Sequence, residues 1–221
     1  MLKRVSTLIF AAAGLVAAPY ASAEIQGYVS GGLGFNAVTG DVVNLHPAKP
    51  GDPPALPANS TSGISNFTGQ IEGGARFAMP NDDNIIFGVG LYINPFTLKA
   101  DDENDNLGEG LTIDIKDMRG LVGEVGWKLG ASTVAYGKVS LNQGRMEGTF
   151  RAPGAITGPI TQSFSGIGFG AGLRQSLASN MYVFTEWHHI VGSKVSFALE
   201  GGYHNIKPKL TTGLVGAGWT F

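Results

Sequence analysis

The sequence predicts an all-β fold, an eight-stranded antiparallel up-and-down barrel that spans a membrane with its strands. Three observations predict it: an export signal at the N-terminus, apolar and polar residues that alternate with a period of two, and long and short breaks that follow each other in strict turn. Charged residues make up only 14% of the chain, and its 34 glycines are far above ordinary usage.

Residues 1–23 have the pattern of a secretory signal peptide. Lys3 and Arg4 form a basic region, residues 8–18 are apolar, and small residues at 21–23 form a cleavage site. We expect cleavage after Ala23, which leaves residues 24–221 as one barrel domain. The alternative, an N-terminal membrane anchor, is less favoured because the apolar run is shorter than the roughly 20 residues of a spanning helix.

The composition excludes several classes of function. The chain has no cysteine, which excludes thiol catalysis, cysteine-ligated zinc and disulfides. Its net charge of −2 provides no basic surface for nucleic acid. We expect no cofactor and no metal. An exported chain of this kind is either a soluble β-sandwich or a membrane β-barrel.

The alternation is clearest in residues 66–77, and residues 25–36 repeat it. In the first of these, Phe67 and Ile71 share one face, and Glu72 and Arg76 share the other. Each segment has about the length of a tilted membrane strand. Phe77 lies at the far end of the apolar face from Phe67, as two aromatic girdles at the membrane interfaces require.

Six further segments complete the eight predicted strands. They are residues 85–96, 121–129, 135–142, 167–177, 182–190 and 211–221. The segment 182–190 is ambiguous, because Glu186 and His188 share a face with Tyr182 and Phe184.

The breaks between these segments alternate in length. Residues 79–84, 130–132 and 178–180 are short, and residues 37–65, 97–110, 147–161 and 191–208 are long. Four long and three short connections join eight strands. Outer-membrane barrels have this asymmetry, with long loops outside and short turns on the periplasmic side.

The last quarter of the chain resembles a known family. Residues 214–221 alternate and end on Phe221, which is similar to the signal that the barrel-assembly machinery reads in outer-membrane proteins. Residues 168–174 and 180–187 resemble the penultimate hairpin of the opacity-type and OmpA-like barrels. The resemblance implies a place in the bacterial outer membrane, contact with its lipid and lipopolysaccharide, and an assembly signal formed by Trp219 and Phe221.

Charged residues on the inner faces are the candidate site. An eight-stranded barrel has an interior just wide enough for side chains to fill. The predicted network in this interior is Glu72, Arg76, Glu124, Lys128, Lys138, Arg174 and Glu186. Opposite charges favour a closed, stabilised interior, because an unpaired buried charge costs several kcal/mol. The alternative is a gated narrow pore.

Candidate reactive residues cluster near the end of the seventh predicted strand. Glu186, His188, His189 and Ser193 lie close in sequence, but neighbouring residues of a strand point to opposite faces. The acidic run 101–105 lacks the glycine and the terminal glutamate of a helix-loop-helix calcium loop. The proline-rich segment 47–57 is predicted to be extended.

These observations predict a non-enzymatic surface barrel. We expect it to act in envelope integrity, or in adhesion or binding of a host or envelope ligand through four extracellular loops. Two alternatives remain at this point: a narrow channel with a charged lumen, and an outer-membrane enzyme that modifies lipid A.

Overall fold

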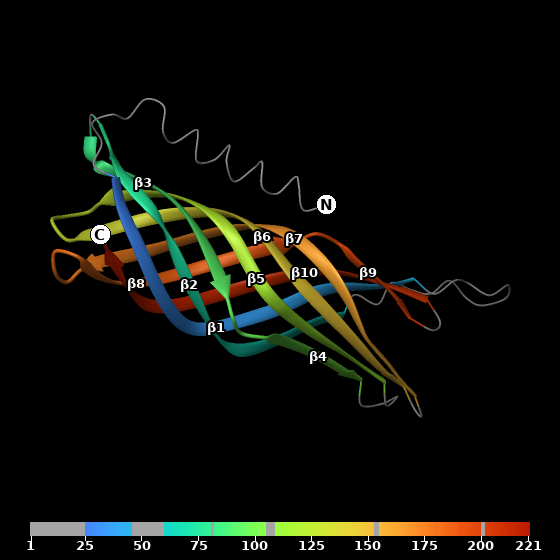
Figure 1. Cartoon of the computed structure of the whole chain (residues 1–221). Helices are drawn as coiled ribbons and strands as arrows, with labels where there is room; N and C mark the ends of the chain where they lie inside the picture. The colour runs from blue at the N-terminus through green and yellow to red at the C-terminus, as the bar shows by residue number, and fades with distance from the viewer. Residues whose placement is uncertain (1–24, 46–59, 81, 105–108, 153–154, 200–201) are drawn as a thin grey trace.

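The structure is a computed structural model, and it describes residues 25–45, 60–80, 82–104, 109–152, 155–199 and 202–221 (Figure 1). The strands are β1 (Ile25–Leu45), β2 (Ser60–Met79), β3 (Asp82–Asn94), β4 (Leu98–Asn104), β5 (Glu109–Lys128), β6 (Thr133–Ala152), β7 (Ala155–Ser176), β8 (Met181–Gly192), β9 (Val195–Leu199) and β10 (Gly202–Thr220). The predicted signal peptide and the segment 47–57 lie outside the described residues. No helix among the described residues is long and apolar enough to cross a membrane.

The strands form a closed antiparallel ring with eight positions. β1 pairs with β2 on one side and with β10 on the other, over nearly its whole length. β3 and β4 together occupy one position of the ring, because both pair with β5, and β8 and β9 together occupy another, because both pair with β10. The closure confirms the predicted eight-stranded barrel and excludes the soluble sandwich, whose sheets would not join in a ring.

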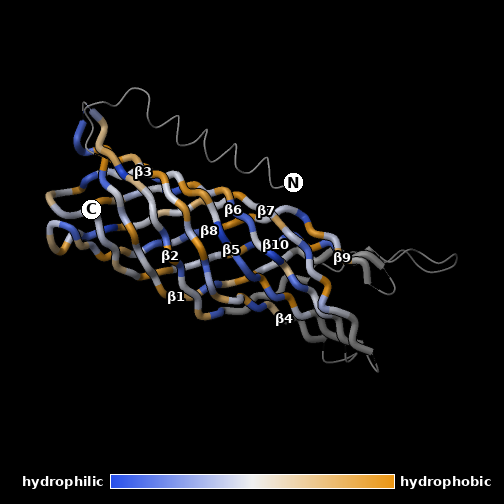
Figure 2. The backbone as a smooth tube through the Cα atoms, viewed as in Figure 1, coloured by the Kyte–Doolittle hydropathy of each residue, from blue (hydrophilic) through white to orange (hydrophobic). Residues whose placement is uncertain are grey.

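The strands around the ring, apart from the short β4 and β9, present apolar side chains to the outside over a continuous band. On β1 these are Leu33 and Phe35, and on β2 they are Phe67 and Ile71, each about half exposed or more. The residues of this band are those that the sequence predicts to face outward. Figure 2 shows the alternation of hydropathy along the strands. In β8 the ambiguity is settled, since Trp187 points outward and Glu186 and its even-numbered neighbours point inward.

Strands replace most of the long loops that the sequence predicts. β1 continues to Leu45, and β6 and β7 pair up to Ala152 and Ala155, across the break expected at residues 147–161. Residues 101–104 of the acidic run lie in β4 and not in a loop. The prediction of four long irregular loops was therefore wrong in extent. The three short turns lie at the end of the barrel that carries Phe221, as expected.

Beyond the apolar band the polar and apolar faces of the long strands change places. In the apolar band of β6, Leu141 points outward and Lys138 inward. Farther along the same strand, Arg145 points outward and the fully buried Met146 inward. Outside the membrane the surroundings are water, so the burial rule of soluble proteins applies again. A pattern that requires apolar residues on the outward face therefore predicts the strand only up to the point where the faces change places.

Beyond the apolar band the ring divides into two sheets. β2 pairs with β3 only over Ile71–Met79, and β7 pairs with β8 only over Gly166–Ser176. Past these points, β4 follows β5 and β9 follows β10. Among the described residues, β4 forms no ladder with β2, and β9 forms none with β7. One sheet is therefore β4–β5–β6–β7 and the other is β9–β10–β1–β2, and they diverge at the right of Figure 1.

The two sheets enclose an apolar core, and we call this part of the molecule the outer sandwich. The first sheet contributes Leu98, Ala100, Ile113, Ile115, Met118, Met146 and Phe164. The second sheet contributes Val38, Val195, Phe197, Ile206 and Leu210, and Ile190 of β8 lies at the base. Each is at most 5% exposed. The arrangement is that of a β-sandwich, with inward apolar residues from both layers.

Candidate functional site

Ion pairs fill the interior of the barrel at the level of the apolar band. Near the end with the short turns, the carboxylate of Glu124 on β5 accepts a hydrogen bond from Arg76 of β2 at 3.3 Å and another from Arg174 of β7. The guanidinium of Arg76 also donates to Tyr182 at 3.2 Å and lies 3.5 Å from the centre of the Tyr28 ring. The carboxylate thus lies between two cations that the surrounding rings shield from water.

A second set of ion pairs lies one step farther along the interior. Lys138 of β6 donates to Glu72 at 2.8 Å and to Glu186 at 2.6 Å. Tyr28 donates to Glu72 at 2.7 Å, and Tyr136 donates to Glu186 at 3.0 Å. Each carboxylate therefore has a cation and a phenol as partners, which offsets part of its loss of hydration.

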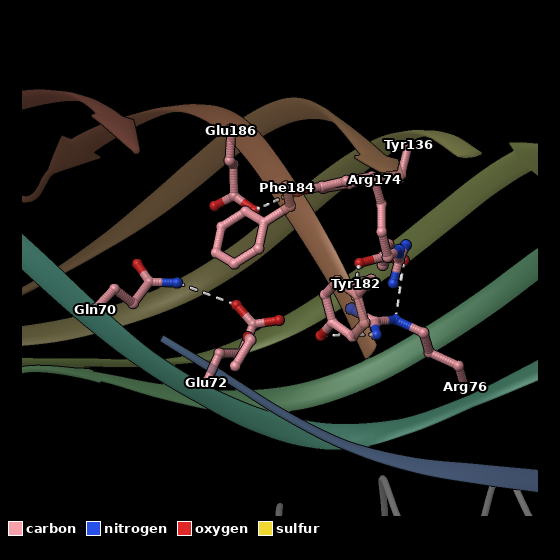
Figure 3. A pocket seen from close by; sticks show the side chains of 10 residues that line it. Gln70, Glu72, Arg76, Tyr136, Arg174, Tyr182, Phe184 and Glu186 are labelled. Carbon is pink, nitrogen blue, oxygen red and sulfur yellow. Dashed lines mark hydrogen bonds and ion pairs between the residues drawn. The ribbon is translucent and has the colours of Figure 1, made fainter. Parts of the chain in front are cut away.

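The charges of this layer balance. We call Glu72, Arg76, Glu124, Lys138, Arg174 and Glu186 the charged layer. Figure 3 labels four of these residues where they point into the interior: Glu72, Arg76, Arg174 and Glu186. The layer joins three cations with three carboxylates, all at most 8% exposed. Lys128, the seventh predicted member, is half-buried near the turn at 129–132 and takes part in none of the ion pairs among the described residues. Without Lys128, the numbers of positive and negative groups in the layer are equal.

Glycines make room for the tyrosines that cross the interior. A Cβ at Gly172 would collide with the ring of Tyr136, and one at Gly218 would collide with Tyr182. The cavity that remains in the charged layer measures about 10 Å³, which is close to the least volume that holds one water. At this cavity the charged layer leaves room for about one water molecule.

Uncharged polar side chains form a belt between the charged layer and the outer sandwich. We call this set the polar belt: Asn36, Thr68, Tyr92, Asn94, Ser140, Asn142, His188 and Thr212. Its hydrogen bonds join Asn36 to Thr212 and Asn94 to Thr68, each at 2.8 Å. Tyr92 donates to Asn142, which in turn donates to Ser140 at 2.9 Å.

The candidate reactive residues do not come together, and His188 and His189 point to opposite faces as expected. Glu186 and His188 point into the barrel, whereas His189 points outward, bonds to Thr211 at 2.8 Å and stacks on Trp187. Ser193 lies exposed between β8 and β9, where its backbone N–H donates to the carbonyl of Ser165. No group of three metal-ligating side chains occurs among the described residues.

The structure instead brings Ser140 to His188, a pair that sequence reasoning missed. Their Oγ and Nε2 atoms lie 2.9 Å apart, which is the distance of a nucleophile and its base. Both side chains are 2% exposed, and the charged layer and the outer sandwich cover them on the two sides. A hydrogen bond enclosed in this way fits a structural role. The two residues are 48 positions apart, and no sequence signal links them.

The outward faces of the outer sandwich carry charges of both signs. Lys116 bonds to Glu147 at 2.6 Å, and Arg145 bonds to Asp117. The hydrogen bond to Glu147 raises the pKa of Lys116 above its ordinary value. Arg119 is exposed just beyond the apolar band. This surface has the composition of one that faces water.

The last strand ends at the rim with the short turns. Phe221 is 80% exposed, and its backbone exchanges two hydrogen bonds of 2.9 Å with Gly27 of β1. Trp219 points outward in the apolar band, opposite Val29. The predicted assembly signal thus lies where the ring closes.

A protein-family comparison decides the identity of this barrel. The model of the family described as "Outer membrane protein beta-barrel domain" matches residues 8–221. The chain belongs to this family. It is a protein of the Gram-negative outer membrane, and the predicted resemblance to small outer-membrane barrels is confirmed. No curated protein matches the sequence.

Solved structures of the same kind include OprG of Pseudomonas aeruginosa, with 13% identity and a TM-score of 0.54, over 88% of this chain and 96% of that one. Ail of Yersinia pestis has 15% identity and a TM-score of 0.44, over 88% and 99%. The outer-membrane protease OmpT of Escherichia coli has 10% identity and a TM-score of 0.47, over 89% and 97%. At these identities the likeness concerns the fold.

Proposed function

We propose that this protein is a non-enzymatic surface barrel that acts in envelope integrity or binds a host or envelope ligand at its outer end. The observation that supports the proposal is the outer sandwich. It extends the barrel past the apolar band as paired strands, and its outward residues are polar and charged. A rigid polar surface loses little conformational entropy when it binds a partner.

The proposal is tested on intact cells that lack the gene and are complemented with the full chain. We expect the chain to restore resistance to detergents or to confer binding to a panel of host matrix proteins and sulfated glycans. Replacing Lys116, Arg119 and Arg145 by serine should weaken the binding, because phosphate, sulfate and carboxylate groups prefer such cations. Serine at Lys128, near the opposite rim, is the matched control. Equal behaviour of cells with and without the chain in every assay refutes the proposal.

The enzyme alternative has a separate test. Lipid A from cells with and without the chain should show the same acyl pattern by mass spectrometry, because Ser140 and His188 are covered on both sides. A change in the acyl pattern that is lost in Ser140→Ala would assign catalysis to this pair and overturn the non-enzymatic proposal.

A further inference from the structure

Two layers of different chemistry close the interior of this barrel. The charged layer and the polar belt consist of carboxylates, cations, hydroxyls and amides, all groups that also bind water. The core of the outer sandwich consists of aliphatic, aromatic and methionine side chains that are at most 5% exposed. A wall of apolar side chains offers no hydrogen bonds to water and no ligands to an ion. Water therefore leaves a narrow apolar constriction, and the constriction is closed to ions by this dewetting.

We infer that the core of the outer sandwich, and not the layer of ion pairs, is the seal between the interior of the barrel and the outside. In this view the charged layer stabilises the membrane part of the barrel, whereas the apolar core above it prevents permeation. The inference is independent of the ligand or envelope role proposed above.

The contacts between the two sheets support the seal. The ring of Phe197, on β9, lies 3.2 Å from the place that a Cβ on Gly148 would take, and Gly148 is on β6 of the opposite sheet. Phe164 of β7 similarly lies 3.2 Å from the corresponding place on Gly192, at the end of β8. The ring of Phe197 therefore crosses the space between the sheets and rests on a glycine of the opposite sheet, whereas Phe164 lies over the end of the neighbouring strand β8.

The two lines along which the sheets separate are also closed at their base. Between β2 and β4, the amide of Asn66 donates to the carbonyl of Lys99 at 2.7 Å. Between β7 and β9, Ser193 N donates to the Ser165 carbonyl at 2.6 Å. Leu98 and Val195 begin the apolar core directly after these bonds. A hydrogen bond therefore bridges each line of separation at its base, next to the apolar core.

The first test uses the absence of cysteine from the chain. Ser140→Cys places one thiol in the polar belt, below the core, and Ser163→Cys places one on the exposed face of β7. A charged thiol reagent that does not cross membranes is added outside intact cells. We expect the thiol at position 140 to react at least about 100-fold more slowly than the one at 163, because reaction needs local opening. Comparable rates would overturn the inference.

The same thiol then reports on the core. Adding Met146→Ser and Phe197→Ser makes both sheets polar at the seal, and we expect labelling at position 140 to rise at least tenfold while labelling at 163 stays the same. Should this variant not fold, as judged by loss of strand signal in circular dichroism, the comparison of positions 140 and 163 in the otherwise native chain decides the matter.

A second test separates the two layers by conductance. Serine at all six positions of the charged layer removes the ion pairs and keeps the interior neutral. We expect no resolved conductance steps in planar bilayers from this variant, because the core is intact, and steps only when Met146→Ser and Phe197→Ser are added. Steps in the sixfold variant alone would place the seal in the charged layer and overturn the inference.

Discussion

Lys138 is the residue on which the charged layer depends most. Its ammonium group bonds to both Glu72 and Glu186, and no other cation among the described residues pairs with either carboxylate. Lys138→Met leaves two buried carboxylates without their cation, and we expect it to lower the free energy of unfolding by about 3–5 kcal/mol. Urea titration of the protein in detergent micelles measures this.

Lys128→Met is the matched control for that substitution. Lys128 also lies on the inward side of a strand, but near the rim and outside the charged layer. We expect a change within about 0.5 kcal/mol. Equal losses from the two lysines would show that the ion pairs of Lys138 add nothing.

Ile71 tests the placement of the membrane. It is half exposed and faces outward in the apolar band, between Gly31 and Ile93. Arginine at this position should lower the free energy of unfolding in lipid by about 2–4 kcal/mol if it lies at the midplane of the bilayer. Ser163→Arg, on the outer sandwich, should change it by about 0.5 kcal/mol or less. A neutral Ile71→Arg would mean that the apolar band is misplaced.

At the scale of strands, the outer sandwich is stabilised by its core. Ile115 of β5 has no exposed surface, and Ile115→Ala should cost about 2–5 kcal/mol through lost burial and the cavity that remains. Thr161→Ala, exposed on β7, should cost about 0.5 kcal/mol or less. Thermal unfolding of the two variants compares them. A small effect at Ile115 would contradict close packing between the two sheets.

The closing strand permits a test of the assembly signal. Deleting Phe221 removes an exposed ring and two backbone hydrogen bonds to Gly27 at the rim, and leaves the rest of the β1–β10 ladder. We expect assembly in cells to fall strongly and refolding in detergent to remain largely intact. The amount of folded protein in purified outer membranes, set against the refolded yield, measures the difference. An equal loss in both would mean that Phe221 acts through stability alone.

Local alternation was enough to predict the membrane part of each strand. Six of the seven inward charges singled out in the sequence lie together, because a period of two assigns every side chain to a face. The outer sandwich was not predicted, since its polarity runs opposite to that of a membrane strand. Its signal was present in β6, where Arg145 and Met146 continue the alternation with the faces exchanged.

Local sequence patterns do not predict the division into two sheets or the Ser140–His188 hydrogen bond. Both depend on which strands lie next to each other around the ring, and these contacts join residues far apart in sequence. Pro95 and the break at 193–194 mark where β3 and β8 end, but they do not say which neighbour each strand leaves.

The whole molecule is a closed barrel in two parts. Within the membrane it is apolar outside and charged inside, and beyond the membrane it is polar outside and apolar inside. Each part presents to its surroundings the polarity that they favour, and buried side chains of the opposite polarity pack its interior.

The most direct test of this account is the conductance of the unmodified protein in a planar lipid bilayer. The account predicts no resolved steps above the baseline at any voltage the bilayer withstands, because the charged layer and the apolar core both fill the interior. Reproducible steps of uniform size, present with this protein and absent with a detergent blank, would contradict it and assign the protein to the narrow channels.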